Sequence, residues 1–297
     1  MSATNILTDG EAGVISSAPR YPTLRRFARH RLAVIGVVII VLLIIACAVG
    51  PSLVPYGQFQ LDMRHRFQAP LAGPHLLGSD ELGRDQLARL LMAGRISLAI
   101  GLAAMLISVG IGSCIGLVSG FYGGAIGAVL MRFVDAILCF PSIFLLLTLA
   151  ALIHPSVVTI TLIVALTAWM EVARIVYGQI RALREQDFVA AAIASGSTSR
   201  RIMFREMLPN AMGPIIVAAT LIVARAILLE SYVSYLGYGI QPPVPSWGNM
   251  LEKAQQYLTT APWLAILPGL MITLTVASFN FVGDGLRDAL DPRSDLR

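Results

Sequence analysis

The chain has 297 residues, of which 56% are hydrophobic and 13% charged, and its mean hydropathy is +0.75. Soluble domains carry about 25% charged residues, and the surface of a soluble protein of this length must meet water. The composition therefore excludes an ordinary soluble enzyme, a disordered protein and a secreted disulfide scaffold, and it indicates a polytopic membrane protein. The formal charge of +5 predicts no nucleic-acid partner, because the basic residues stand at the ends of apolar runs.

Apolar runs long enough to cross a lipid bilayer, about 20 residues each, predict an all-α membrane protein with six transmembrane helices. The stretch Ala46-Cys47-Ala48 resembles a signal-peptidase site. The basic leader before it is about 30 residues long, which exceeds a typical signal peptide, so we expect an uncleaved anchor. The predicted spans are residues 32–50, 96–119, 132–153, 157–177, 209–236 and 263–282.

Basic residues near the span ends set the expected orientation. With residues 1–31 inside the cell, the cytoplasmic segments hold 15 Lys or Arg and the outside segments hold six. Segment 174–205 decides the assignment, because it alone holds six arginines. We therefore expect residues 1–31 and the tail 283–297 in the cytoplasm, residues 51–95 as an extracytoplasmic loop, and residues 96–282 as a five-helix core.

The extracytoplasmic loop contains four prolines between Pro51 and Pro74 and is expected to be irregular. Ser79 is a suitable N-cap for a short helix that runs through Glu81. Leu87–Arg95 has the pattern of an interfacial amphipathic helix. The sequence thus predicts a loop that ends in a helix lying on the membrane surface.

Segment 179–209 is too long to be only a connector between neighbouring spans. Three consecutive alanines at 190–192 favour a helix and present little bulk. Gly196 ends this helix, and Ser199 can begin a second one that Pro209 closes. A short slim helix suits insertion into a groove on another protein. A helix that lies on the headgroups, held by arginines, explains the pattern equally well.

This segment resembles the cytoplasmic coupling loop of ABC importer permeases, in which Glu-Ala-Ala, Gly and Leu-Pro stand at fixed spacing. Ala190 occupies the position of the glutamate and Glu206 that of an aliphatic residue, so the sequence departs from the pattern at two points. The resemblance implies that the segment contacts an ATPase. The residues that it assigns to this coupling contact are Ala190, Ala191, Ala192, Gly196, Leu208 and Pro209.

Three further motifs are similar to those of the dipeptide, oligopeptide and nickel permeases of ABC importers. They are Leu77–Asp85 together with Gly94–Leu98, then Leu236–Gly248, and Phe279–Arg293. The long first outside loop and the extended N-terminal segment resemble the C-type subunit of these importers. The similarity covers about residues 24 to 294, with the motifs in the family's order.

The resemblance implies a type I ABC importer permease fold with a cytoplasmic coupling helix, in the bacterial inner membrane. The implied partners are a homologous B-type permease in a heterodimer, two ATPase subunits that bind ATP and Mg²⁺, and an extracytoplasmic substrate-binding protein. The implied cargo is a peptide or a related small solute, and this chain itself binds no cofactor. The residues agree, because Lys253, the one lysine of the chain, lies in no Gly-rich phosphate loop.

Ionisable residues inside apolar spans are costly and usually face a cavity or a partner. Glu171 and Arg174, three residues apart, are predicted to form a structural ion pair near the inner end of the fourth span. Arg225 and Glu230 lie deeper, in the fifth span, about 140° apart around the helix. One is expected to line the translocation pathway and the other to meet a neighbouring helix. The alternative is that they form structural pairs or pair with another subunit.

A stripe of small residues, Gly112, Gly116 and Gly120, follows Ser108 at helical spacing. It predicts close helix packing, within this subunit rather than against the partner. Pro141 and Pro268 fall inside predicted spans and should bend them.

Two other classes of protein compete with the importer. An ion-coupled secondary transporter would need its own ion site and internal repeats, and we find neither in the sequence. A membrane-embedded enzyme would need a nucleophile or a metal cluster. No metal site is predicted, because the cysteines lack ligand spacing and the histidines stand apart near span ends. These histidines are His30, His65, His75 and His154.

Overall fold

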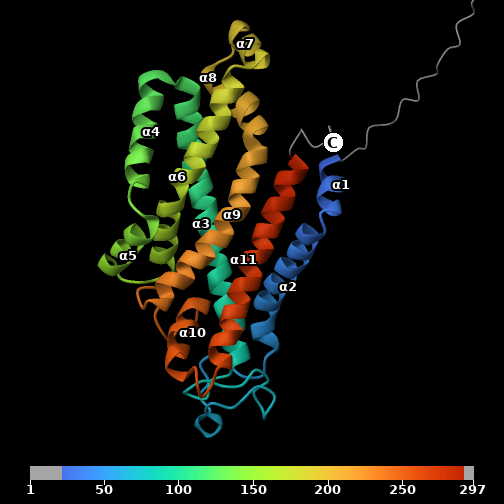
Figure 1. Cartoon of the computed structure of the whole chain (residues 1–297), viewed down its shortest axis with the longest axis vertical. Helices are drawn as coiled ribbons and strands as arrows, with labels where there is room; N and C mark the ends of the chain where they lie inside the picture. The colour runs from blue at the N-terminus through green and yellow to red at the C-terminus, as the bar shows by residue number, and fades with distance from the viewer. Residues whose placement is uncertain (1–21, 291–297) are drawn as a thin grey trace, which may run out of the picture.

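The computed structural model describes residues 22–290, which form an elongated bundle of helices (Figure 1). The segments 1–21 and 291–297 of the predicted cytoplasmic ends lie outside the described residues. The α-helices are α1 (Pro22–Arg29), α2 (Arg31–Leu53), α3 (Gln86–Tyr122), α4 (Gly124–Leu138), α5 (Ser142–Leu152), α6 (Val157–Arg184), α7 (Asp187–Ala194), α8 (Ser199–Arg201), α9 (Leu208–Tyr235), α10 (Trp247–Ala254) and α11 (Trp263–Leu290). Three shorter elements are the 3-10 turns η1 (Met63–His65) and η3 (Gln255–Tyr257) and the π-helical segment η2 (Ile202–Met207).

The long helices lie roughly along the long axis, with α7 at one end and the loop between α2 and α3 at the other (Figure 1). Among the described residues, five helices are long and apolar enough to cross a membrane, and the bent pair of α4 and α5 makes a sixth. The prediction of an all-α protein with six spans is confirmed.

The third span is broken rather than merely bent. Helices α4 and α5 meet at an angle of 78°. Pro141 stands at the N-cap of α5, where it interrupts the helix because it has no N–H to donate to the preceding turn. Pro268, in contrast, lies inside α11, which continues through it.

Helix α3 corrects the prediction for the end of the outside loop. It runs without interruption from Gln86, so the stretch Leu87–Arg95 is the first part of a long continuous helix and not a separate short one. This part of α3 packs on α10, since the Trp247 indole Nε1 donates to the Leu90 carbonyl oxygen at 3.1 Å. The helix expected after Ser79 is absent from this described stretch. Asp85 is the N-cap instead, and its Oδ1 accepts from the Ala88 N–H at 2.7 Å.

The glycine stripe of α3 packs against α6, as predicted. A Cβ atom added to Gly116 would lie 2.6 Å from the Ala173 carbonyl oxygen, so the two backbones approach too closely for a side chain between them. The Ser108 hydroxyl, at the start of the stripe, donates to the Ala165 carbonyl oxygen at 3.0 Å. Close packing within the subunit thus joins α3 and α6 along their length.

Candidate coupling helix and translocation cavity

Helix α7 is a short helix at the end of the molecule opposite the outside loop (Figure 1). It stops where the sequence predicted, because Gly196 has a φ of +73°, a left-handed conformation that glycine adopts at little cost. The Ser197 N–H donates to the Ala192 carbonyl at 3.1 Å and the Gly196 N–H to the Ile193 carbonyl at 3.0 Å. These two bonds form a Schellman motif, which satisfies carbonyls at the helix end.

The two faces of α7 differ. Val189 is fully buried, and Ala192 packs partly buried on the same side. Ala190 and Ala191 are exposed, and the side chain of Ile193 beside them is 56% exposed. The helix therefore offers a slim, apolar outer face while one side chain anchors it to the bundle.

The segment after α7 differs from the prediction. Thr198, not Ser199, caps the next helix, since its Oγ1 accepts from the Arg201 N–H at 3.4 Å. Pro209 does not close that helix, because α8 passes through the π-helical η2 directly into α9. The wider π spacing just before Pro209 accommodates a residue that cannot donate a backbone hydrogen bond. Leu208 packs against the bundle, and Pro209 is exposed.

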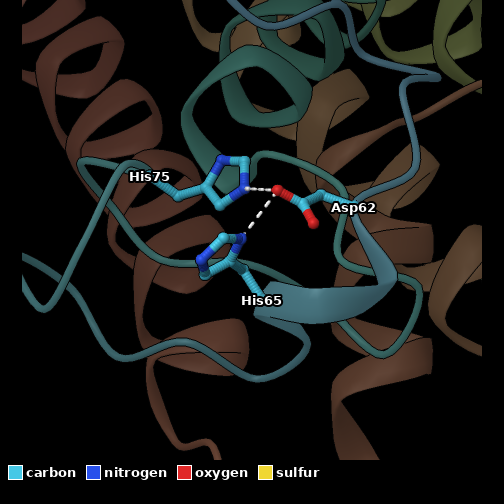
Figure 2. A group of neighbouring side chains, drawn as sticks. All are labelled: Asp62, His65 and His75. Atoms are coloured by element: carbon cyan, nitrogen blue, oxygen red, sulfur yellow. Dashed lines mark hydrogen bonds and ion pairs between the residues drawn. The ribbon is translucent and has the colours of Figure 1, made fainter.

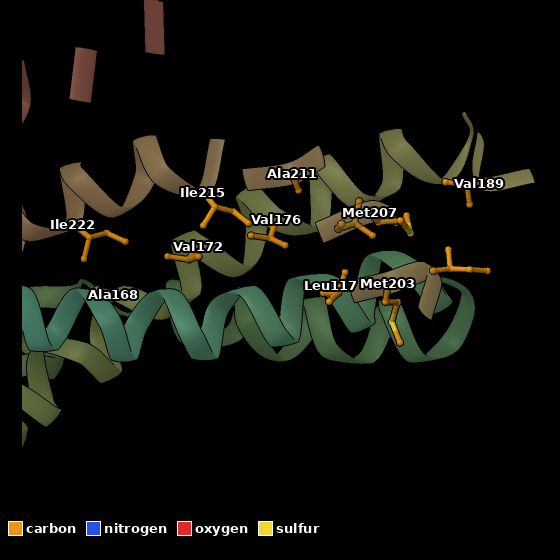
Figure 3. Packing of buried hydrophobic residues seen from close by; sticks show 12 residues of the cluster. Leu117, Ala168, Val172, Val176, Val189, Met203, Met207, Ala211, Ile215 and Ile222 are labelled. Atoms are coloured by element: carbon orange, nitrogen blue, oxygen red, sulfur yellow. The ribbon is translucent and has the colours of Figure 1, made fainter. Parts of the chain in front are cut away.

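A continuous apolar cluster connects α7 to the long helices (Figure 3). Val189 of α7 lies at one end of it, and the buried side chains of η2 follow. The cluster continues between α3, α6 and α9 toward the middle of the bundle. Its buried members are Leu117, Ala168, Val172, Val176, Ile180, Val189, Ile202, Met203, Met207, Ala211, Ile215 and Ile222.

A cavity of about 350 Å³ opens between α6, α9 and α11. Its polar groups are Glu171, Arg225 and Asn280, and the rest of its lining is apolar. The Arg225 guanidinium donates to the Glu171 carboxylate from the facing helix. Both side chains are about half exposed, at 54% and 48%, so the pair is open to the cavity.

The predicted pair of Glu171 with Arg174 is wrong. Arg174 binds Asp135 of α4, with its Nε 3.1 Å from Asp135 Oδ1, while Glu171 binds Arg225 of α9. Residues three apart on a helix diverge by about 60°, and each of these two faces an opposite charge on a different neighbouring helix.

Glu230 lies apart from the cavity, although Arg225 is only five residues away on α9. Its side chain is fully buried. It accepts hydrogen bonds from the Ser97 hydroxyl of α3 at 3.1 Å and the Ser234 hydroxyl at 2.8 Å. Of the two candidates for the pathway, Arg225 thus lines a cavity and Glu230 meets a neighbouring helix.

The structure also brings together residues that the sequence analysis treated as separate. In the outside loop, His65 Nδ1 lies 2.8 Å from Asp62 Oδ2, and His75 Nε2 lies 3.8 Å from the same oxygen (Figure 2). The expectation that the histidines stand apart is wrong for these two. Spacings of three and ten residues in an irregular loop carry no pattern that predicts a shared site, so only the fold reveals the cluster.

Comparison with known proteins identifies the family. Residues 112–295 match the model of the binding-protein-dependent transport system inner membrane component, and residues 22–70 match the N-terminal transmembrane domain of oligopeptide transport permease C.

Individual relatives cover nearly the whole chain. The oligopeptide transport system permease protein OppC of Haemophilus influenzae is 40% identical over 270 residues, which span 91% of this chain and 87% of that protein. OppC of Escherichia coli is 38% identical over 91% of this chain and 89% of its own length. The dipeptide transport system permease protein DppC of Alkalihalophilus pseudofirmus is 37% identical over 93% of this chain and 90% of its own length.

These matches confirm what the coupling segment and the three motifs indicated. The matched range 112–295 contains α7, the cavity lining, the last four spans and the end of α3 in one continuous stretch. This chain belongs to the family of inner membrane components of binding-protein-dependent transport systems, the permeases of ABC importers.

Proposed function

We propose that this chain is one of the two permeases of an ABC importer that brings peptides, or a related small solute, across the bacterial inner membrane. Its relatives are named as oligopeptide and dipeptide transport permeases. The complete importer contains a B-type permease, two ATPase subunits that bind ATP and Mg²⁺, and an extracytoplasmic binding protein. In this assembly the chain binds no nucleotide cofactor, and both of its termini face the cytoplasm.

The observation that carries the proposal is the apolar cluster between α7 and the cavity. Val189 anchors α7 to it, and Val172 and Ile222 belong to both the cluster and the cavity lining. Because close-packed side chains transmit displacement rather than absorb it, a push on α7 tilts α6 and α9 together. ATP-driven closure of the ATPases then opens the pathway outward, and reset after hydrolysis opens it inward. The nucleotide-bound ATPases must bind the two states differently for this to occur.

The cavity suits a cargo with charged ends. Peptides carry an ammonium and a carboxylate, and the half-exposed Arg225 and Glu171 offer one group of each opposite sign. Asn280 adds a neutral donor and acceptor from α11. In the described state Arg225 and Glu171 bind each other. When a peptide enters the cavity, Arg225 can bind its carboxylate and Glu171 its ammonium group.

Substitution of Gly196→Asp tests the coupling role. A side chain at this left-handed φ costs roughly 1–2 kcal/mol, and the new charge lies beside the slim face of α7. We expect normal membrane insertion and assembly, continued ATP hydrolysis, and loss of solute uptake in proteoliposomes that contain the full complex.

Gly237→Asp is the matched control, because Gly237 has a similar φ of +83° at the opposite end of the molecule. It should retain the ratio of uptake to ATP hydrolysis. Normal uptake by the Gly196→Asp variant would refute the assignment of α7. Uptake that proceeds on an ion gradient without ATP would instead support the secondary-transporter alternative, which no relative named above favours.

A further inference from the structure

The outside loop contains a group of metal-binding side chains that the transport mechanism does not use. Asp62, His65 and His75 each offer one ligand atom, and these three atoms all lie within 4.8 Å of one another. Figure 2 shows the two imidazole rings turned toward the same carboxylate oxygen of Asp62. Two histidines and one carboxylate form a ligand set that Zn²⁺ and related divalent transition metals prefer.

His75 is held for this role by a second carboxylate. Its side chain is 1% exposed, and its Nδ1 lies 2.9 Å from Oδ2 of Asp85, which is also buried. An ionised carboxylate only accepts hydrogen bonds, so Nδ1 donates to Asp85, and Nε2 is the ring atom that faces Asp62. A carboxylate–histidine–metal arrangement fixes the ring of a metal ligand in the same way.

The surroundings of the His75 Nε2 atom indicate a binding site for a cation. It is buried and has no hydrogen-bond partner within residues 22–290. It faces Asp62 Oδ2 from 3.8 Å, a separation too long for a hydrogen bond. In a tetrahedral zinc site, ligand atoms about 2.0–2.2 Å from the metal lie roughly 3.3 Å apart, which is close to this separation.

The other two groups are open to the outside of the membrane. His65 and Asp62 have side chains that are 45% and 30% exposed, which leaves a route for a metal and room for a water ligand. The hydrogen bond with His65 holds the pKa of the Asp62 carboxyl below its ordinary value. One oxygen of this carboxylate, Oδ2, faces both imidazole rings.

We propose that Asp62, His65 and His75 bind one divalent transition metal of the Zn²⁺ class, with Asp85 as the carboxylate that orients His75. The metal joins η1 to the segment that leads into α3, because Asp85 also caps α3 through its Oδ1. It thus fastens the outside loop to the first long helix of the core.

Metal titration of the purified full transporter tests the site. A tag without histidines and prior stripping with a chelator remove other sources of metal. We expect about one Zn²⁺ bound per copy of this chain, and Co²⁺ in its place should give visible absorption bands of a tetrahedral complex. His65→Ala should abolish tight binding. His65 is half exposed, so this variant should unfold at the wild-type temperature when free of metal.

Asp85→Asn is the sharper variant. Asparagine is as good an N-cap as aspartate, so α3 keeps its start, while His75 loses the carboxylate that orients it. Loss of such a partner costs about 10- to 100-fold in metal affinity. If the hydrogen bond between His75 and Asp85 only stabilised the fold, the Asp85→Asn variant would bind metal with the wild-type affinity.

His154→Ala, in another exposed turn of the chain, is the control and should bind metal as the wild type does. Wild-type protein that binds no metal, or that binds it as tightly as the Asp62→Asn/His65→Ala double variant, would overturn the proposal. His75 would then be an imidazolium that bridges Asp62 and Asp85 without a metal.

Discussion

At the scale of single residues, loss of the charged pair in the cavity should impair transport without lowering the stability of the fold. Arg225 and Glu171 are each about half exposed, and ion pairs of this exposure contribute about 0–1 kcal/mol to the free energy of unfolding. Arg225→Gln should therefore change the thermal midpoint little. It should raise the apparent KM for a peptide with free termini about tenfold or more, because a hydrogen bond to a charged group is worth about 1.5–3 kcal/mol.

Arg174→Gln provides the matched control for that prediction. Arg174 and Asp135 form a similar pair, with side chains that are 54% and 40% exposed, on the side of α6 that faces α4. Uptake kinetics measured in proteoliposomes should stay at the wild-type level for this variant. Equal losses in both arginine variants would mean that charge, not position in the cavity, causes the effect.

At the scale of elements, the packing of α3 on α6 depends on the absence of side chains along one stripe. A Cβ at Gly116 would lie 2.6 Å from a backbone oxygen of α6, and overpacking of this kind costs about 1–3 kcal/mol. Gly116→Ala should therefore lower the midpoint of thermal unfolding of the purified permease complex in detergent.

Gly110, on the same helix, is the control for the stripe. Nothing lies within 4 Å of a Cβ added there, and alanine is favoured over glycine in a helix by about 1 kcal/mol. Gly110→Ala should leave the midpoint unchanged or raise it. A fall as large as that of Gly116→Ala would show that the loss does not come from the contact between α3 and α6.

At the scale of the whole molecule, the loop between α2 and α3 and the turn that precedes α7 occupy opposite ends of the bundle (Figure 1). The distribution of arginines predicts that the loop is outside the cell. In a chain without Cys47, Cys114 and Cys139, Leu71→Cys should react with a membrane-impermeant maleimide in intact spheroplasts. Glu185→Cys should react only after the membrane is opened.

Both test positions are exposed, so access to the reagent depends on the side of the membrane alone. Labelling of Glu185→Cys in intact spheroplasts would reverse the assigned orientation and place α7 where no ATPase could reach it.

Sequence patterns alone predict the membrane class, the six spans, the glycine stripe and the end of α7 at Gly196. Each is a local signal: apolar runs, small residues at helical spacing and a left-handed glycine act within one segment of chain. The motifs of the coupling segment and of the ends of the core also identified the family before any contact was known.

The choice of ion-pair partners, in contrast, depends on how the helices pack. Arg174 and Arg225 bind partners that are 39 and 54 residues away along the chain. The buried Glu230 accepts a hydrogen bond from Ser97, which is 133 residues away. A periodic pattern within one helix cannot choose among several oppositely charged neighbours on others. The same reason explains two other features that sequence patterns do not predict: the first residue of α3, and the cluster of Asp62, His65 and His75. Both depend on which helices pack against a helix end or a loop.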